Sequence, residues 1–314
     1  MTTSHVPAYW QLRDSGELAR RTAKAMQALQ CCDLCARYCY VNRIESIKGA
    51  VCHTGENAIV HSFGPHHGEE NPLRGWRGSG TIFFSWCNLR CQYCQNWEIS
   101  QKGVGREVTP QELADIMLSL QAQGCHNINF VSPSHVVAQI ISAVNIAATQ
   151  GLRLPLVYNT GGYDSLEALA LLDGIIDIYM PDMKYGDSDL AHRYSHARNY
   201  VAINRLAAKE MHRQVGDLVL DENGIAVRGL LVRHLVLPHH IAGTDSVLKF
   251  IAHEISTDTY INMMDQYYPC YRADEYPQLA RTIDPAEYNE ALRIARHYSL
   301  HRLDGYNIAR SANV

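Results

Sequence analysis

Strand-like and helix-like stretches alternate along the middle of the chain. Short apolar runs, typical of buried strands, occur at residues 80–85, 127–132, 155–159, 175–180 and 260–264. Helices are predicted at residues 110–124, 134–150, 165–172, 189–214, 244–254 and 284–300. The first of these begins with the capping box Thr109-Pro110-Gln111-Glu112, which has proline at the first helical position. Because strands that alternate with helices form parallel sheets, this pattern predicts an α/β fold.

The number of strands decides between a closed and an open sheet. Residues 218–220 and 225–237 are expected to pair through Asp221-Glu222-Asn223-Gly224, because Asn-Gly favours hairpin turns. About six parallel strands then predict a partial (β/α)6 barrel of the TIM type, rather than the closed barrel of eight strands. The polar residues that follow the strands are expected to meet at their carboxyl ends, where such barrels carry their chemistry.

The two ends of the chain differ from this middle part. A basic helix is predicted at residues 14–30, a cysteine-rich loop at 31–52, and an irregular connector rich in Gly, Pro and His at 63–72. We therefore divide the chain into an N-terminal helix with a cysteine-rich metal-binding segment (1–75), the partial barrel (76–265) and a C-terminal extension with the final helix (266–314).

Composition and charge indicate which partners and which cellular compartment the protein is suited to. The net charge of −4 over 314 residues argues against broad binding to nucleic acid or to anionic membranes. No apolar run approaches the roughly 18–20 residues of a membrane span, and the start Met1-Thr2-Thr3-Ser4-His5 has no signal-peptide pattern. Ten cysteines, most of them in two clusters, indicate metal binding in a reducing compartment. We expect a cytoplasmic protein with an oxygen-sensitive metal centre.

The most informative cluster is the C-x3-C-x2-C run of Cys87, Cys91 and Cys94, directly after the strand at 80–85. Three thiolates on one short loop can hold three irons of a [4Fe–4S] cluster and leave the fourth iron without a protein ligand. An open coordination position marks a reaction site, as it does on catalytic zinc, whereas electron carriers usually close the cluster with a fourth cysteine. The alternatives are a zinc knuckle, which lacks a fourth ligand at close spacing, and a set of buried apolar thiols.

This loop resembles the signature of the radical S-adenosylmethionine (SAM) superfamily, in which the open iron chelates the amino and carboxylate groups of SAM. The resemblance places Tyr93 against the adenine. Residues 78–84, 91–101 and 264–270 are similar to one subgroup, the activating enzymes of pyruvate formate-lyase and other glycyl radical enzymes. The likeness extends from about Cys32 to Gly305.

The resemblance also implies SAM-binding roles at the strand ends. Lys184, in the sequence Asp182-Met183-Lys184, would neutralise the SAM carboxylate or hold its ribose. Asp182 aligns with a monovalent-cation site beside SAM, and the other residues of that site are Met180, Asn159 and Thr160. Asn159 stands where the subgroup usually has aspartate.

A second departure concerns the Gly-Gly-Glu motif that binds the SAM amino group in the superfamily. This chain has Val131-Ser132-Pro133-Ser134-His135 at that place, so the hydroxyl of Ser132 or Ser134 is expected to accept the ammonium. The pair Gly161-Gly162 follows one strand too late for the motif and is interpreted as a strand-ending turn. His234 is a candidate contact of the adenosine, with an ordinary core histidine as the alternative, and Cys270 is a candidate contact of the substrate.

The other cysteine cluster is Cys32-x2-Cys35-x3-Cys39-x12-Cys52. Four thiols close a metal site, so this one would hold structural zinc or a fully ligated iron–sulfur cluster. The alternative is a group of reduced, partly buried thiols.

The resemblance implies a reaction that begins with one electron from flavodoxin or ferredoxin. The reduced cluster cleaves SAM to methionine and a 5′-deoxyadenosyl radical, which abstracts hydrogen from a bound substrate. This step needs no catalytic base, and none is assigned. In an activating enzyme the target is a glycine Cα of a glycyl radical enzyme or another protein substrate. Two alternatives stay open: a radical SAM enzyme that modifies a small molecule or RNA, and a non-enzymatic iron–sulfur electron carrier or scaffold.

Overall fold

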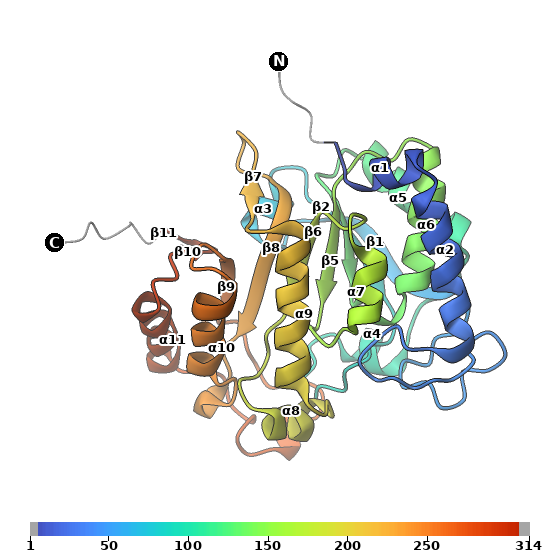
Figure 1. Ribbon diagram of the computed structural model, residues 1–314. Coiled ribbons are helices and arrows are strands. Elements are labelled where there is room, and N and C mark those ends of the chain that lie inside the picture. Colours follow the sequence, from blue (N-terminus) through green and yellow to red (C-terminus); the bar gives the residue numbers. More distant parts are fainter. Residues whose placement is uncertain (1–5, 308–314) are drawn as a thin grey trace.

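An open, mostly parallel β-sheet organises the chain (Figure 1). The computed structural model describes residues 6–307, so the start Met1–His5 lies outside the described residues. The strands follow the order β11-β10-β9-β8-β6-β5-β4-β2-β1-β3, and β7 pairs with β8. Their bounds are β1 Ala58–His66, β2 Ser79–Phe84, β3 Arg106–Val108, β4 Ile128–Val131, β5 Leu156–Thr160, β6 Ile178–Pro181, β7 Val219–Leu220, β8 Ala226–Leu235, β9 Tyr260–Met264, β10 Arg302–Leu303 and β11 Tyr306–Asn307.

The parallel part of the sheet confirms the predicted fold class. The successive neighbours β2, β4, β5, β6, β8 and β9 are all paired in parallel. Within the described residues the sheet begins at β3 and ends at β11 without closing on itself. The predicted hairpin is present as β7 and β8. The carboxyl ends of the parallel strands therefore lie together at one end of the sheet, the lower end in Figure 1.

Most of the helices cover the outer face of this sheet (Figure 1). The bounds of the helices are α1 Tyr9–Asp14, α2 Glu17–Ala28, α3 Asn71–Arg74, α4 Trp97–Lys102, α5 Pro110–Ala122, α6 Val137–Thr149, α7 Leu166–Leu172, α8 Ser188–Ser195, α9 Tyr200–Val215, α10 Thr244–Phe250 and α11 Pro285–His297. The predicted capping box of α5 is formed in the structure. None of the helices in the described residues is long and apolar enough to cross a membrane.

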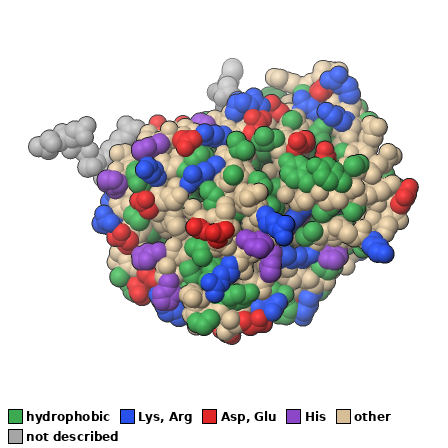
Figure 2. Space-filling model, turned by 60° about the horizontal axis from the view of Figure 1, so that its bottom comes forward, with side chains coloured by type: hydrophobic (Ala, Val, Ile, Leu, Met, Phe, Trp, Pro, Cys, Tyr) green, Lys and Arg blue, Asp and Glu red, His purple; other side chains and the backbone are tan. Residues whose placement is uncertain are grey.

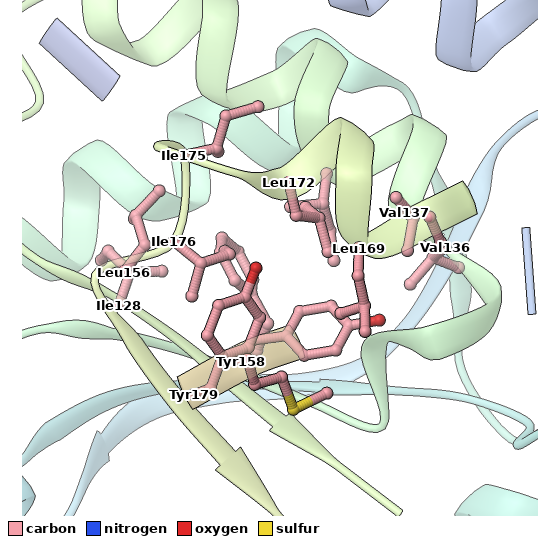
Figure 3. Close-up of a cluster of buried hydrophobic side chains, with 14 of the residues drawn as sticks. Ile128, Val136, Val137, Leu156, Tyr158, Leu169, Leu172, Ile175, Ile176 and Tyr179 are labelled. Atoms are coloured by element: carbon pink, nitrogen blue, oxygen red, sulfur yellow. The ribbon is translucent and has the colours of Figure 1, made fainter. Parts of the chain in front are cut away.

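The largest core lies between the sheet and these helices. Tyr158 of β5 and Tyr179 of β6 project outward under Leu169 and Leu172 of α7 (Figure 3). A smaller apolar cluster that includes Leu73, Val157, Ile178 and Leu231 fills the inner side. Asn127, just before β4, donates a hydrogen bond to the Leu73 carbonyl at 2.8 Å, which places α3 at the amino-terminal end of the sheet. Helix α3 therefore covers the amino-terminal end, and the candidate site lies at the carboxyl end.

The connector predicted at residues 63–72 is wrong in its first half. Strand β1 runs through it, antiparallel to β2, and is paired on its other side with β3 over Ala58–Val60 only. The half that contains Gly64 and Pro65 is therefore open on one side. Proline is tolerated there because an open edge needs no backbone donor. Gly64 and Pro65 are typical of loops, so the sequence pattern did not predict a strand here.

One predicted helix is divided in the structure. The zone 189–214 separates into α8 and α9, because His196 and Asn199 adopt left-handed backbone conformations with φ of 50° and 54°. The helix predicted at 14–30 is present as α2, and the shorter α1 precedes it, separated from it at Gly16, whose φ is 75°. The helix at 244–254 continues past α10 as a π-helical turn, Ile251–Ile255.

The division of the chain into 1–75, 76–265 and 266–314 stays a prediction.

Candidate active site

The cluster loop, residues 85–97, follows β2 at the carboxyl end of the sheet. Cys91 is 8% exposed, and Cys87 and Cys94 are half-buried. Each sulfur has a hydrogen-bond partner: the Leu89 N–H is 3.4 Å from Cys87 Sγ, the Ser195 hydroxyl 3.0 Å from Cys91 Sγ, and the Ser100 hydroxyl 3.1 Å from Cys94 Sγ. Hydrogen bonds to thiolate sulfurs are one of the means by which proteins tune iron–sulfur clusters.

The electrostatics of Cys87 and Cys94 fit a bound cluster. Burial, with smaller contributions from Cys91 and Cys87, raises the pKa of Cys94 to about 12. Burial also raises the pKa of Cys87. A metal cluster offsets this cost because it pairs each thiolate with a cation. Within the described residues no three Cys, His, Asp or Glu side chains stand in metal-coordination geometry. The fit to a [4Fe–4S] cluster with one open iron therefore rests on the donor set and its hydrogen bonds.

Helix α8 holds the cluster loop in place. The Arg90 N–H donates to the Ser195 carbonyl at 3.0 Å, and the Gln92 N–H donates to the Tyr194 carbonyl at 2.8 Å. The Ser195 hydroxyl is itself 2.7 Å from the Tyr185 hydroxyl. The loop is thus joined to the last turn of α8 by two backbone hydrogen bonds and by the contact of the Ser195 hydroxyl with Cys91 Sγ.

Tyrosine rings form an apolar wall around Cys91. Tyr93 meets the rings of Tyr185 and Tyr267 edge to face, with centroids 6.5 and 5.9 Å apart. Tyr185 meets Tyr200 in the same way at 5.6 Å. Such a shell limits water and lowers the local dielectric around a metal site. Tyr93 is 5% exposed, and its predicted contact with adenine stays a prediction.

Charged residues stand at the next strand ends, beside the loop. Lys184 Nζ forms an ion pair with Asp182 Oδ2, and Arg233 Nε donates to Asp182 Oδ1 at 2.8 Å. Burial raises the pKa of Asp182, but Arg233 and Lys184 outweigh that effect and the net shift is downward. Burial lowers the pKa of Lys184, but Asp182 and Cys91 outweigh it and the net shift is upward. Asp182 and Lys184 therefore stay charged, and Lys184 lies close enough to Cys91 to sense its charge.

Helix α9 supports this segment from behind. The Tyr200 hydroxyl accepts the Lys184 N–H at 3.1 Å and lies 2.9 Å from the Gly161 carbonyl. Asn204 Nδ2 donates to the carbonyls of Gly162 and Asp182, both at 3.0 Å. Gly162 has a φ of 72°, and a Cβ on it would lie 2.3 Å from the Asp182 carbonyl oxygen. The glycine pair is thus the predicted strand-ending turn, and it permits the close approach of the β5 and β6 ends.

A buried hydroxyl network occupies the place of the missing Gly-Gly-Glu motif. Ser134 Oγ lies 2.8 Å from Thr160 Oγ1, which donates to Asp164 Oδ2 at 2.6 Å. Burial raises the pKa of Asp164 despite these bonds. Ser132 is half-buried in a left-handed conformation, with φ of 58°. The roles of Ser132 and Ser134 toward the SAM amino group stay predictions, as does the cation site of Asn159, Thr160, Met180 and Asp182.

Two histidines near the site are buried and neutral. His234 Nδ1 lies 2.7 Å from the Met183 carbonyl and Nε2 lies 3.0 Å from the Thr244 hydroxyl, and burial lowers its pKa to about 4. Both ring nitrogens have protein partners, and the contact with adenosine stays a prediction. His135 Nε2 lies 2.9 Å from the Ser85 carbonyl, and burial lowers its pKa to about 3. His135 thereby holds the start of the cluster loop.

The N-terminal cysteines gather around one small cavity, lined by Cys32, Cys35, Cys39 and Cys52. Burial raises the pKa of Cys35, and the other three thiols add to that effect. The buried Arg43 guanidinium is 3.5 Å from Cys32 Sγ. All four thiols are free of disulfides. Four thiols around one cavity are the donor set of a closed metal site, although within the described residues they do not stand in coordination geometry. The metal there stays a prediction.

Contacts join this N-terminal site to the cluster loop. Arg37 donates to the Asn88 carbonyl at 2.6 Å, and Arg90 donates to the Val51 carbonyl. The ring of His53 lies 4.6 Å from that of Trp86. The C-terminal segment also contacts the loop: the Arg272 N–H donates to the Gln92 carbonyl at 2.9 Å. Cys270 is half-buried two residues away.

Sequence reasoning does not identify several residues that position the site. Ser195, Tyr200 and Asn204 lie on helices, where a polar residue among apolar ones resembles an ordinary amphipathic pattern. Asp164 and His135 lie just beyond strand ends, at the places where barrels carry their chemistry. That position was their available signal.

The chain is similar to several known proteins. A family model described as the radical SAM superfamily matches residues 81–220. The uncharacterized protein MJ0674 of Methanocaldococcus jannaschii is 32% identical over 277 residues, which cover 86% of this chain and 75% of that protein. The uncharacterized protein MJ0808 of the same organism is 24% identical over 266 residues, covering 78% of this chain and 73% of that protein.

Solved structures show weaker likeness. A radical SAM methyltransferase from Sphaerobacter thermophilus aligns with a TM-score of 0.49 at 13% identity, over 70% of this chain and 64% of its own. SuiB of Streptococcus suis, bound to SAM, aligns with a TM-score of 0.48 at 12% identity, over 71% of this chain and 50% of its own. This chain thus spans less than two thirds of either protein.

The matched residues 81–220 begin in β2, contain the whole cluster loop, and extend to β7. They include the three thiols, the Gly161-Gly162 turn and the Asp182–Lys184 segment. The chain belongs to the radical SAM superfamily, whose members cleave SAM at an iron–sulfur cluster.

Proposed function

We propose that this protein abstracts a hydrogen atom from a bound substrate after cleaving SAM at a cluster held by Cys87, Cys91 and Cys94. The observation that supports the proposal most is this set of three thiol donors on one loop. Each has a hydrogen-bond partner, and their loop lies beside the charged pair Asp182 and Lys184 at the carboxyl end of the strands.

When bound, the cluster supplies the electron that cleaves SAM to methionine and a 5′-deoxyadenosyl radical. The chain's own residues bind and orient the reactants. Lys184 is charged and partly exposed, with 17% of its side chain open to solvent, so it can neutralise the SAM carboxylate. Tyr200 and Asn204 fix the backbone that carries it. The tyrosine wall around Cys91 excludes water from the radical.

As the finer part of the proposal, the substrate is a glycine of a glycyl radical enzyme, and flavodoxin or ferredoxin is the reductant. Its support is the similarity of residues 78–84, 91–101 and 264–270 to the activating enzymes. The test is to mix the reduced protein with pyruvate formate-lyase and SAM and to seek the glycyl radical by electron paramagnetic resonance. Absence of the radical while SAM is consumed would remove this substrate and leave the reaction class intact.

We further propose that Cys32, Cys35, Cys39 and Cys52 bind zinc or an auxiliary iron–sulfur cluster, because they converge on one cavity beside Arg43. Metal analysis of the anaerobically purified protein and of Cys52→Ala distinguishes the two. Loss of zinc alone identifies a zinc site, and loss of about four irons identifies a second cluster.

The reaction class is tested by anaerobic reconstitution with iron and sulfide, followed by dithionite and SAM. We expect 5′-deoxyadenosine from the wild type and none from Cys91→Ala. Cys125→Ala is the matched control, because Cys125 is a buried thiol outside both clusters. If Cys91→Ala and wild type form the same amount of product, the proposed ligand set is wrong.

A further inference from the structure

A buried polar group lies on the inner side of the sheet, below the site described above. We call it the polar floor and define it as Glu69, Glu70, Asn129, Arg233 and Asn262. Asn262 of β9 donates to Glu70 Oε1 at 2.9 Å, and Arg233 Nη1 is 3.9 Å from the same oxygen. Arg233 and Asn262 are directly paired residues of β8 and β9. The floor therefore reaches across the sheet from β4 to β9.

Depth separates the floor from the cluster loop. Asn129 is paired with Thr81 of β2, four residues before Ser85, where the loop begins. At about 3.3 Å per residue along a strand, this level lies about 13 Å below the start of the loop. The floor nevertheless connects to the upper site, because Arg233 also donates to Asp182 at 2.8 Å. A molecule bound between them would lie within the barrel, under SAM.

Hydrogen-bonding capacity on the floor is unused. Asn129 has no exposed surface, yet its Oδ1 lacks a hydrogen-bond partner, and its amide lies next to the Glu69 carboxylate, whose pKa it lowers. Glu70 is 5% exposed, and its Oε2 also lacks a partner. Leaving one such group unpaired costs about 1–3 kcal/mol, and folded proteins satisfy most buried polar groups. Two unpaired acceptor atoms in one place therefore point to a ligand that donates to both.

The charges show which kind of ligand is needed. The Glu69 and Glu70 side chains are 8% and 4% exposed. Burial and the charge of Glu70 both raise the pKa of Glu69. Arg233 is the cation facing both carboxylates, and it is already shared with Asp182. His66 Nδ1 lies 3.3 Å from Glu69 Oε1 without forming a hydrogen bond. The floor thus has more carboxylate oxygens than cationic donors.

We propose that the polar floor binds a substrate through a primary amine or guanidinium group, with Glu69 and Glu70 as acceptors and Asn129 as a further partner. This inference rests on the reaction class of the proposed function and adds the chemical class of its substrate; on a protein substrate, the group would be a lysine or arginine side chain near the target glycine. The ammonium or guanidinium supplies the donors that Glu70 Oε2 and Asn129 Oδ1 lack. The remainder of the substrate then extends upward, toward the Asp182 and Lys184 pair and SAM.

The test is anaerobic calorimetry on the reconstituted protein loaded with SAM but without reductant. Cadaverine and agmatine are the amine and guanidine probes, and n-pentanol is the neutral probe. We expect saturable binding of a charged probe, no binding of n-pentanol, and at least tenfold weaker binding in both Glu70→Gln and Asn129→Ala. Glu254→Gln, an exposed carboxylate that pairs with Lys209, is the control and should bind like wild type.

Either of two results would overturn the proposal. One is the absence of charge-dependent binding by the wild type, which would leave the floor to internal water alone. The other is a loss of SAM affinity in Glu70→Gln as large as the loss of probe affinity, which would assign the floor to SAM. Glu69→Gln provides a second variant if Glu70→Gln does not fold. Because no reductant is present, failure here is distinct from failure to cleave SAM.

Discussion

Replacing Tyr200 by phenylalanine removes one buried hydroxyl from the support of the strand end that carries Asp182 and Lys184. That hydroxyl accepts the Lys184 N–H at 3.1 Å and lies 2.9 Å from the Gly161 carbonyl and 3.1 Å from the Asp182 carbonyl. The Asp182 carbonyl keeps the Asn204 amide at 3.0 Å in the variant. The Lys184 N–H and the Gly161 carbonyl lose the partner that Tyr200 provides.

The substitution should lower both the free energy of unfolding and the affinity for SAM. Each buried group left unpaired costs about 1–3 kcal/mol, so with partial relaxation the free energy of unfolding should fall by about 2–4 kcal/mol. Urea denaturation measures this loss. Because the backbone that carries Lys184 loses a fixed contact, SAM should also bind about tenfold more weakly, which corresponds to about 1.4 kcal/mol. Anaerobic calorimetry on the reconstituted protein measures the affinity.

Tyr163→Phe is the matched control. Its ring stacks on Tyr200 at 6.0 Å, and its hydroxyl donates to the Arg198 carbonyl at 2.8 Å, away from Lys184. We expect a loss of about 1 kcal/mol in stability and no change in SAM affinity. The reasoning is refuted if Tyr200→Phe destabilises no more than this control, or if it destabilises the protein and leaves SAM affinity unchanged.

Two further predictions concern stability. The pKa values of His135 and His234, lowered to about 3 and about 4, mean that each binds a proton on unfolding at mildly acidic pH. Each should therefore reduce stability as pH falls below about 6.5, by up to about 1.4 kcal/mol per pH unit, and His234→Gln should flatten the dependence measured by urea denaturation. Gly103→Ala should cost more than about 2 kcal/mol, because its φ is 68° and its Cβ would lie 2.1 Å from the Trp86 ring. Gly224→Ala, at a φ of 78° with open space around it, should cost only the backbone strain of about 1 kcal/mol.

The outcomes that would contradict these two predictions are specific. A stability that is flat between pH 6.5 and 5 would show that the two histidines are not buried as neutral groups. Equal losses in Gly103→Ala and Gly224→Ala would show that the Trp86 ring does not pack on Gly103.

Local chemistry explains which features of the fold could be predicted from the sequence. The capping box at Thr109 and the Asn223-Gly224 turn are short-range signals, and both elements form as expected. Strand β1 escaped prediction because its second half contains Gly64 and Pro65, and its pairing with β2 and β3 is not visible in its own pattern. The break between α8 and α9 depends on His196 and Asn199 in left-handed conformations, which these residue types adopt more often than most but which neither of them requires.

The residues of the candidate site show the same difference between short-range signals and long-range contacts. The three cysteines could be recognised because their spacing alone brings the thiols together on one loop. Ser195 could not, because its contact with Cys91 spans 104 residues and exists only once α8 packs against the loop. The polar floor is a tertiary feature of the same kind: Glu70 and Asn262 lie 192 residues apart in sequence.

The central claim is that the three thiols leave one iron free to bind SAM. Mössbauer spectroscopy of the reconstituted protein, with Cys52→Ala to remove the N-terminal site, tests it directly. Added SAM should change the signal of one iron in four, because that iron gains nitrogen and oxygen ligands. A fully loaded cluster whose spectrum does not change with SAM would contradict it and would favour an iron–sulfur protein that only carries electrons.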